Sequence, residues 1–348
     1  MLRRALLKNT ATLATGLAGV AFAVLPQLSQ AQTVLTMSSW VPPSHLLTRG
    51  LAAWGLEVEK ATNGRVKLQM LPKHPAAATG TFDAVRDGLV DVSYVTASYT
   101  PARHILPLMA ELPGAGNTAE INSVAYNRIH WKYLDKAGEY KGVKLLGVFT
   151  HGPGQMFNTK KVIDGPEDFQ GMKLRTGGGV ADQMARALGA AAFVKPAPES
   201  YELLSSGVAD GVFFPLESVV SFKLDKIVKH ATIFQGGFYS SAFGFFINEG
   251  AWAKLSKQDQ DIISGLGGEK LARFIGKYWD EGDRVGLESL KAAGVTITPA
   301  TPQLIKATSE KAKILETDWI KAANAKGVDG AKVLAEFREE LKKVSAGQ

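Results

Sequence analysis

The stretch that most constrains the fold runs from residue 171 to residue 215, where strand and helix patterns alternate. Residues 172–176 alternate with a period of two, which predicts a short strand. The glycines at 177–179 permit a tight turn, and residues 180–188 carry apolar side chains at helical spacing. The alternation continues with a strand, a helix and a strand, at residues 191–194, 200–206 and 208–214. Strands that alternate with helices predict a parallel sheet, which binds ligands at the carboxyl ends of its strands.

Arg175 is placed at such a carboxyl end, directly before the glycine-rich turn. A guanidinium can bind a carboxylate through two hydrogen bonds, and the amides and dipole of a helix N-terminus add to the attraction. A lone arginine at a strand end is also typical of a surface charge or a structural ion pair. From the residues alone, both interpretations of Arg175 remain open.

A longer set of residues around Arg175 carries a family resemblance. Its members are Asp168, Gly171, Lys173, Arg175, Leu188–Gly189–Ala190, Glu199, Tyr201–Glu202, Gly207–Val208, Asp210–Gly211 and Pro215. This set resembles the signature of the DctP-type solute receptors of tripartite ATP-independent periplasmic (TRAP) transporters. The similarity continues through residues 62–65 and the helix after residue 256, so it covers nearly the whole chain beyond its first residues.

The resemblance implies an α/β fold of the periplasmic-binding-protein type, with two α/β lobes around a ligand cleft and a long helix spanning both. It implies a non-enzymatic protein that traps a small organic acid by hinge closure and delivers it to a membrane permease. Arg175 would anchor the ligand carboxylate. Gln155 falls where the family places a second ligand-binding arginine or glutamine, although a solvated loop amide fits the residue as well.

Further candidate ligand contacts are Trp40, Thr96, Phe214, Tyr239 and Glu217. Some relatives carry a charged residue at the position of Thr96 and an asparagine at that of Phe214, so the resemblance implies a less polar pocket here. Core packing competes for Trp40 and Phe214, and Glu217 would either join a cation or be a paired acid. We expect an aromatic or short branched monocarboxylate rather than a polyhydroxylated acid.

The first 31 residues predict an export signal. Arg3, Arg4 and Lys8 precede an uncharged run, and Ser29–Gln30–Ala31 is a suitable signal-peptidase site. Residues 3–8 are also close to a twin-arginine signal, so general secretion and twin-arginine export both remain open. The expected location is the periplasm.

Composition excludes several other functions. Beyond residue 31 the chain keeps 37 basic and 33 acidic residues, a net charge of +4 without a basic block, so no nucleic-acid partner is expected. The absence of cysteine excludes disulfides, thiolate chemistry and cysteine metal sites. The histidines show no zinc-binding spacing, and no serine lies in a nucleophile elbow. A monomer without metal or cofactor is expected; a receptor-docking sensor and a secreted enzyme are the alternatives.

The remaining 317 residues are enough for two domains. We predict one lobe from residues 32–152 plus about 242–282, and a second from 153–241 plus about 283–348. A single helix of roughly 35 residues, capped by Ser256 and on the order of 50 Å long, is predicted to span both lobes.

Overall fold

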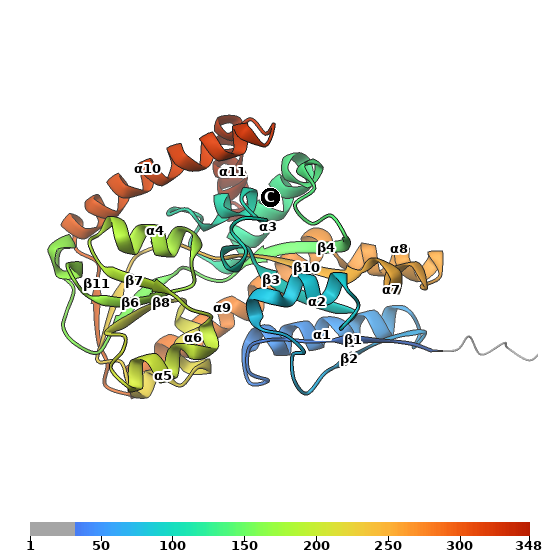
Figure 1. The fold of residues 1–348 in the computed structure, drawn as a ribbon, viewed down its shortest axis with the longest axis horizontal. Helices are drawn as coiled ribbons and strands as arrows, with labels where there is room; N and C mark the ends of the chain where they lie inside the picture. The colour runs from blue at the N-terminus through green and yellow to red at the C-terminus, as the bar shows by residue number, and fades with distance from the viewer. Residues whose placement is uncertain (1–31) are drawn as a thin grey trace, which may run out of the picture. The chain divides into compact units, whose positions relative to one another are not determined.

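The structure, a computed structural model, describes residues 32–348, which contain two sheets with helices packed around them (Figure 1). The predicted export signal at residues 1–31 lies outside the described residues. Across residues 32–348, no helix is apolar over a stretch long enough to cross a bilayer.

The first sheet has five strands in the order β2-β1-β3-β10-β4. Its strands are β1 (Thr33–Met37), β2 (Val66–Met70), β3 (Val92–Thr96), β4 (Val143–Thr150) and β10 (Ala242–Asn248). β10 inserts antiparallel between β3 and β4, with Phe243 opposite Thr96, so the chain returns to this sheet after forming five of the six strands of the second one. The helices of this lobe are α1 (Leu46–Ala61), α2 (Thr81–Arg86), α3 (Ala119–Ile129), α7 (Glu249–Ala253) and α8 (Lys257–Leu266).

The second sheet has six strands in the order β11-β9-β5-β8-β6-β7. They are β5 (Gln155–Asn158), β6 (Lys173–Thr176), β7 (Ala191–Val194), β8 (Gly211–Phe214), β9 (His230–Ile233) and β11 (Thr296–Pro299). β6 is parallel to both β7 and β8, which confirms the parallel sheet predicted for residues 171–215. The helices after these strands are α4 (Gly179–Ala187), α5 (Ser200–Ser205) and α6 (Leu216–Ser221).

The long helix is α9 (Gly268–Ala292), which contacts α1, α3 and β4 of the first lobe and α6 and β11 of the second. The prediction of one continuous helix from residue 256 was wrong, because the chain breaks between α8 and α9. Gly267 is extended and Gly268 has a φ of +56°, and a Cβ at Gly267 would lie 2.5 Å from the Leu146 carbonyl oxygen. The glycine pair therefore lets the chain pack against β4, and α9 spans 25 residues.

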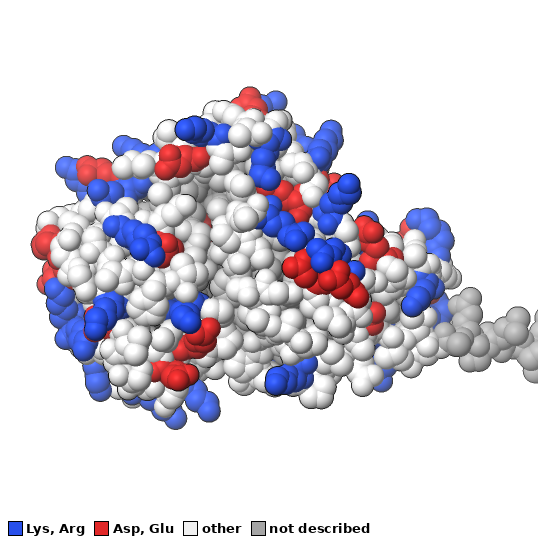
Figure 2. Space-filling model, viewed as in Figure 1, with Lys and Arg blue, Asp and Glu red and all other residues white. Residues whose placement is uncertain are grey.

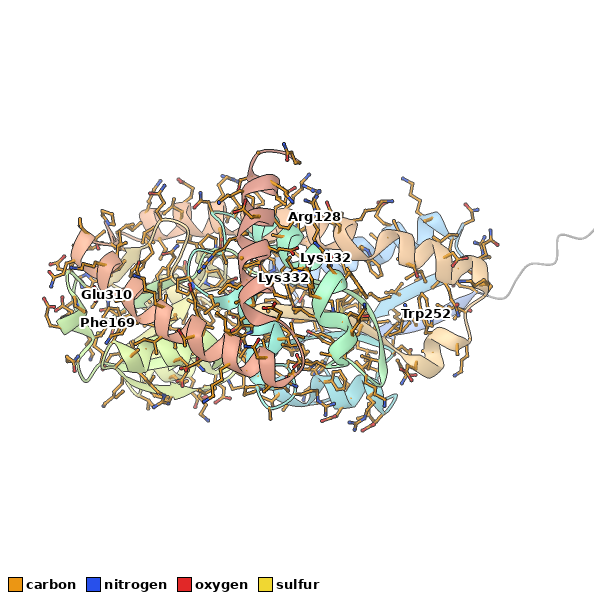
Figure 3. All side chains as sticks on the ribbon, turned by 90° about the horizontal axis from the view of Figure 1, so that it is seen from above. Arg128, Lys132, Phe169, Trp252, Glu310 and Lys332 are labelled. Carbon is orange, nitrogen blue, oxygen red and sulfur yellow. The ribbon has the colours of Figure 1, made fainter. Side chains whose placement is uncertain are left out.

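Two C-terminal helices, α10 (Pro302–Ala325) and α11 (Gly330–Ser345), complete the fold. α10 contacts α4, whereas α11 packs on α3 of the first lobe. Arg128 on α3 donates to Glu340 on α11 at 3.0 Å and to Glu269 at 2.9 Å, beside Lys132 and Lys332 (Figure 3). The C-terminal segment therefore contacts helices of both lobes. The lobe boundaries given above remain a prediction.

Charged side chains of both signs are interspersed on the face drawn in Figure 2, and the middle of that face is largely uncharged. This view gives no indication of a continuous basic surface of the kind that binds nucleic acid.

Candidate functional site

A cavity lies among residues of both lobes, with about 470 Å³ of space between its walls including the part that opens to solvent. The first lobe contributes residues at or just after the ends of β1, β3 and β4 and at the start of α1, and the second contributes the ends of β6 and β8. The cavity lining includes one charged, several aromatic and a few smaller polar side chains: Trp40, Thr96, Tyr99, His151, Arg175, Phe214, Phe222, Tyr239, Phe243 and Trp279.

Arg175 provides the positive charge of this cavity. Its side chain is only 1% exposed, and its Nε and Nη2 atoms donate to the carbonyl oxygen of Lys195 at 2.8 and 2.5 Å. Within residues 32–348, no carboxylate forms an ion pair with it. Burial lowers the pKa of the Arg175 guanidinium, while the neighbouring Tyr99 and Tyr239 act in the opposite direction. A buried cation without an anionic partner is strongly stabilised when a ligand supplies the anion.

Aromatic rings form the walls around this charge. The Phe214 ring centroid lies 4.7 Å from the Arg175 guanidinium carbon, and Phe214 stacks on Phe222 at 5.5 Å. Trp40 contacts Tyr99 with ring centroids 5.3 Å apart. The arrangement suits a flat apolar group attached to one carboxylate, because rings favour stacked and edge contacts with another ring.

Five of the seven predicted ligand contacts line this cavity: Arg175, Phe214, Trp40, Thr96 and Tyr239. Gln155 does not line it. The Gln155 amide accepts from the Phe234 backbone N–H at 2.7 Å and donates to the Phe234 carbonyl oxygen at 3.1 Å. Both ends of that amide therefore hold β5 to the chain that follows β9.

Glu217 also lies outside the cavity lining, as a paired acid between the lobes. Its carboxylate accepts from the Leu46 backbone N–H at 3.0 Å and lies 3.0 Å from His45 Nε2. His45 Nδ1 accepts from the Leu47 N–H, and burial lowers the pKa of the His45 imidazole, so a neutral ring donates through Nε2. Since Glu217 lies in the first turn of α6 and Leu46 begins α1, this carboxylate joins the second lobe to the first.

A second buried carboxylate, Glu111, packs against Gly179, the last of the three glycines that follow Arg175. Glu111 accepts from the Ser98 hydroxyl at 2.7 Å, and its Oε2 accepts from the Val180 N–H at 3.3 Å. Gly178 and Gly179 have positive φ values, and a Cβ at Gly179 would lie 2.4 Å from Oε2. The N-terminus of α4, which the sequence suggested for the ligand carboxylate, is therefore bound by the protein's own Glu111.

Burial raises the pKa of Glu111 to about 7, which gives a testable pH dependence. An acid with a raised folded-state pKa binds its proton more tightly when folded, so its contribution to stability is present below pH 4.5 and is lost as pH rises to 7. We expect the free energy of unfolding of the wild type, minus that of Glu111→Gln, to fall by roughly 3 kcal/mol across this range. Urea unfolding at four pH values measures the difference, and parallel pH profiles for the two proteins would contradict it.

Sequence reasoning missed His151, Phe222, Phe243 and Trp279, which also line the cavity. Trp279 lies on the buried face of α9, where helical periodicity indicates burial but not what the side chain faces. Among the residues that the structure describes, no cluster of three histidine or acidic side chains is arranged to hold a metal ion.

A family model described as "DctP: Bacterial extracellular solute-binding protein, family 7" matches residues 37–322. The chain belongs to this family. Its members bind solutes and are not enzymes, and the predicted DctP-type TRAP resemblance is confirmed.

Three solved TRAP solute-binding proteins share the fold, and each comparison covers 90% of this chain and 99% of the other. One from Bordetella bronchiseptica, with bound (R)- and (S)-mandelate, is 50% identical with a TM-score of 0.88. One from a marine metagenome, specific for aromatic acid ligands and bound to 3-hydroxybenzoate, is 31% identical with a TM-score of 0.84. One from Rhodoferax ferrireducens, with copurified benzoate, is 25% identical with a TM-score of 0.85. The two-lobed fold and the assignment as a TRAP solute-binding protein are therefore confirmed.

Proposed function

We propose that this DctP-family protein captures an aromatic monocarboxylate, with Arg175 binding the carboxylate and the surrounding rings enclosing the arene. The observation that carries the proposal is the buried Arg175 guanidinium, which has no carboxylate partner among residues 32–348 and lies against Phe214. The solved relatives with mandelate, 3-hydroxybenzoate and benzoate support the same ligand class.

The charge of the cavity favours one carboxylate over two. Arg175 is the one lysine or arginine among its lining residues. Burial lowers the pKa of His45, and it lowers that of His151 to about 4, so both rings are neutral near pH 7. A second ligand carboxylate would be buried without a counter-charge, which costs free energy.

The contacts between lobes support binding by closure. The Tyr99 hydroxyl accepts from the Ala197 N–H of the second lobe at 2.7 Å, and Glu217 and Glu111 bridge the lobes as described above. We propose that the ligand adds its own bridge from Arg175 to the first-lobe rings, so that it binds the closed state better than the open one.

Family membership supports the remaining parts of the proposal. The solved relatives include periplasmic proteins of TRAP systems, and we propose that this chain works in the periplasm as a monomer and passes its ligand to a TRAP permease. Analytical ultracentrifugation of the purified protein measures its oligomeric state, and a stable dimer would overturn the proposed monomer.

A ligand panel tests the ligand class. We expect benzoate and phenylacetate to raise the free energy of unfolding by about 2.7 kcal/mol at a hundred times their dissociation constants. Succinate and glucuronate should have no comparable effect at the same concentrations. Thermal unfolding measures the stabilisation by each acid, and calorimetric titration measures its dissociation constant. Preferential stabilisation by succinate or glucuronate would overturn the aromatic assignment.

A further inference from the structure

Trp279 has a buried hydrogen-bond donor that no residue of the described chain satisfies. The side chain is 3% exposed and lines the cavity, yet its indole Nε1 has no partner among residues 32–348. Three other tryptophans, Trp40, Trp54 and Trp319, each donate Nε1 to a backbone carbonyl at 3.0–3.3 Å. A buried N–H left without an acceptor costs free energy, so the Trp279 donor marks a place where a ligand atom can accept.

His151, beside Trp279 in the cavity, supplies the complementary acceptor. The two ring centroids are 5.8 Å apart. His151 Nδ1 lies 2.5 Å from the Gly152 carbonyl oxygen, and a carbonyl only accepts, so Nδ1 carries the hydrogen. The neutral ring then presents Nε2 as an acceptor, and no hydrogen bond to Nε2 is made within residues 32–348.

This donor and acceptor have mostly different neighbours from Arg175. The guanidinium has Phe214, Tyr99 and Tyr239 as its neighbours, and of these Tyr239 also contacts the His151 ring, with centroids 5.4 Å apart. Trp279 instead packs against the rings of His45, His151 and Phe243. A group that meets Trp279 is therefore carried by the ligand away from its carboxylate.

We propose that Trp279 Nε1 and His151 Nε2 form a subsite for a ring hydroxyl group of the ligand. A hydroxyl accepts from the indole N–H and donates to the imidazole nitrogen, whereas an ammonium cannot accept and a carboxylate cannot donate. The ligand class becomes a ring-hydroxylated aromatic monocarboxylate. This inference rests on the proposed function, because it takes the carboxylate to be bound at Arg175.

The test compares benzoate with 3-hydroxybenzoate and 4-hydroxybenzoate by calorimetric titration of the wild type, Trp279→Phe and Trp54→Phe. We expect at least one hydroxybenzoate to bind the wild type about five- to ten-fold more tightly than benzoate. Trp279→Phe should lose the hydroxyl-dependent gain, which is measured as the ratio of the benzoate and hydroxybenzoate dissociation constants within that variant. Trp54→Phe removes an indole N–H outside the cavity, bonded to Leu266, and should keep the gain.

A second variant, His151→Leu, removes the acceptor and leaves Trp279 in place. We expect this variant to lose the hydroxyl-dependent gain in affinity as well. The subsite is overturned if the hydroxyl gives no gain in the wild type, which would mean that it takes only water. It is equally overturned if the gain persists in either variant that still binds benzoate. If neither variant binds benzoate, a hydroxyl-dependent gain in the wild type supports the subsite, and the lack of such a gain overturns it. Failure of every aromatic acid to bind the wild type would instead reject the proposed function.

Discussion

Arg175→Ala is expected to weaken binding of benzoate by more than about a hundred-fold, a loss of roughly 3 kcal/mol or more. The substitution removes the charged lining residue of the cavity, so the ligand carboxylate would be buried among rings without a counter-charge. Calorimetric titration measures the loss. Arg175→Lys keeps the charge but not the planar fork and should bind with intermediate affinity.

The same substitution should have little effect on the stability of the ligand-free protein. Arg175→Ala loses the two hydrogen bonds to Lys195 but also removes a buried charge that no carboxylate of residues 32–348 compensates. These effects oppose each other, so we expect a change within about 1 kcal/mol in the free energy of unfolding. Arg186→Ala, at an exposed arginine paired with Asp182 on α4, is the matched control and should alter neither property. Retention of benzoate affinity within three-fold in Arg175→Ala would show that Arg175 is structural.

Local patterns were sufficient to predict the parallel part of the second sheet, β6, β7 and β8, but not β5 and β9. The period-two strand and the glycine turn at residues 172–179 place Arg175 at the end of β6, in the position that the structure confirms. The break before α9 was not predictable in the same way, because the apolar pattern continues across it. Gly267 stops the helix through its approach to the Leu146 carbonyl of β4, a contact between residues far apart in the sequence.

Site residues at the end of a strand could be predicted from the sequence. Residues whose role depends on tertiary hydrogen bonds were harder to predict. Phe214 and Thr96 lie at the ends of β8 and β3 and line the cavity. Gln155 has the residue type that the family resemblance required, but its amide is used by the Phe234 backbone. Trp279 could not be distinguished from a core tryptophan, because what identifies it is an unpaired N–H, which no sequence pattern reveals.

Glu217→Ala is expected to destabilise the protein by about 3 kcal/mol, because it removes the acceptor for several buried or part-buried donors at once. The Glu217 carboxylate is 2% exposed and accepts from the Leu46 N–H, from His45 Nε2 and from the hydroxyl of Ser221. Two of these donors, at Leu46 and His45, belong to the opposite lobe, so the substitution leaves unpaired groups on both sides of the interface. Urea unfolding measures the effect. Glu202→Ala, at an exposed position on α5, is the control and should change stability by less than about 0.5 kcal/mol.

Glu217 should also affect ligand binding, although it does not line the cavity. If its contacts stabilise the closed arrangement of the lobes, their loss lowers the closed population, and the apparent affinity falls by the same factor. We expect Glu217→Ala to weaken benzoate binding mainly through faster dissociation, since the open lobes still present Arg175. Stopped-flow measurement of both rate constants tests this, and an unchanged dissociation rate in a destabilised variant would limit Glu217 to a structural role. Arg175→Ala then has the opposite profile, with binding lost and stability kept, because Arg175 is paired by the ligand and Glu217 is paired by the protein.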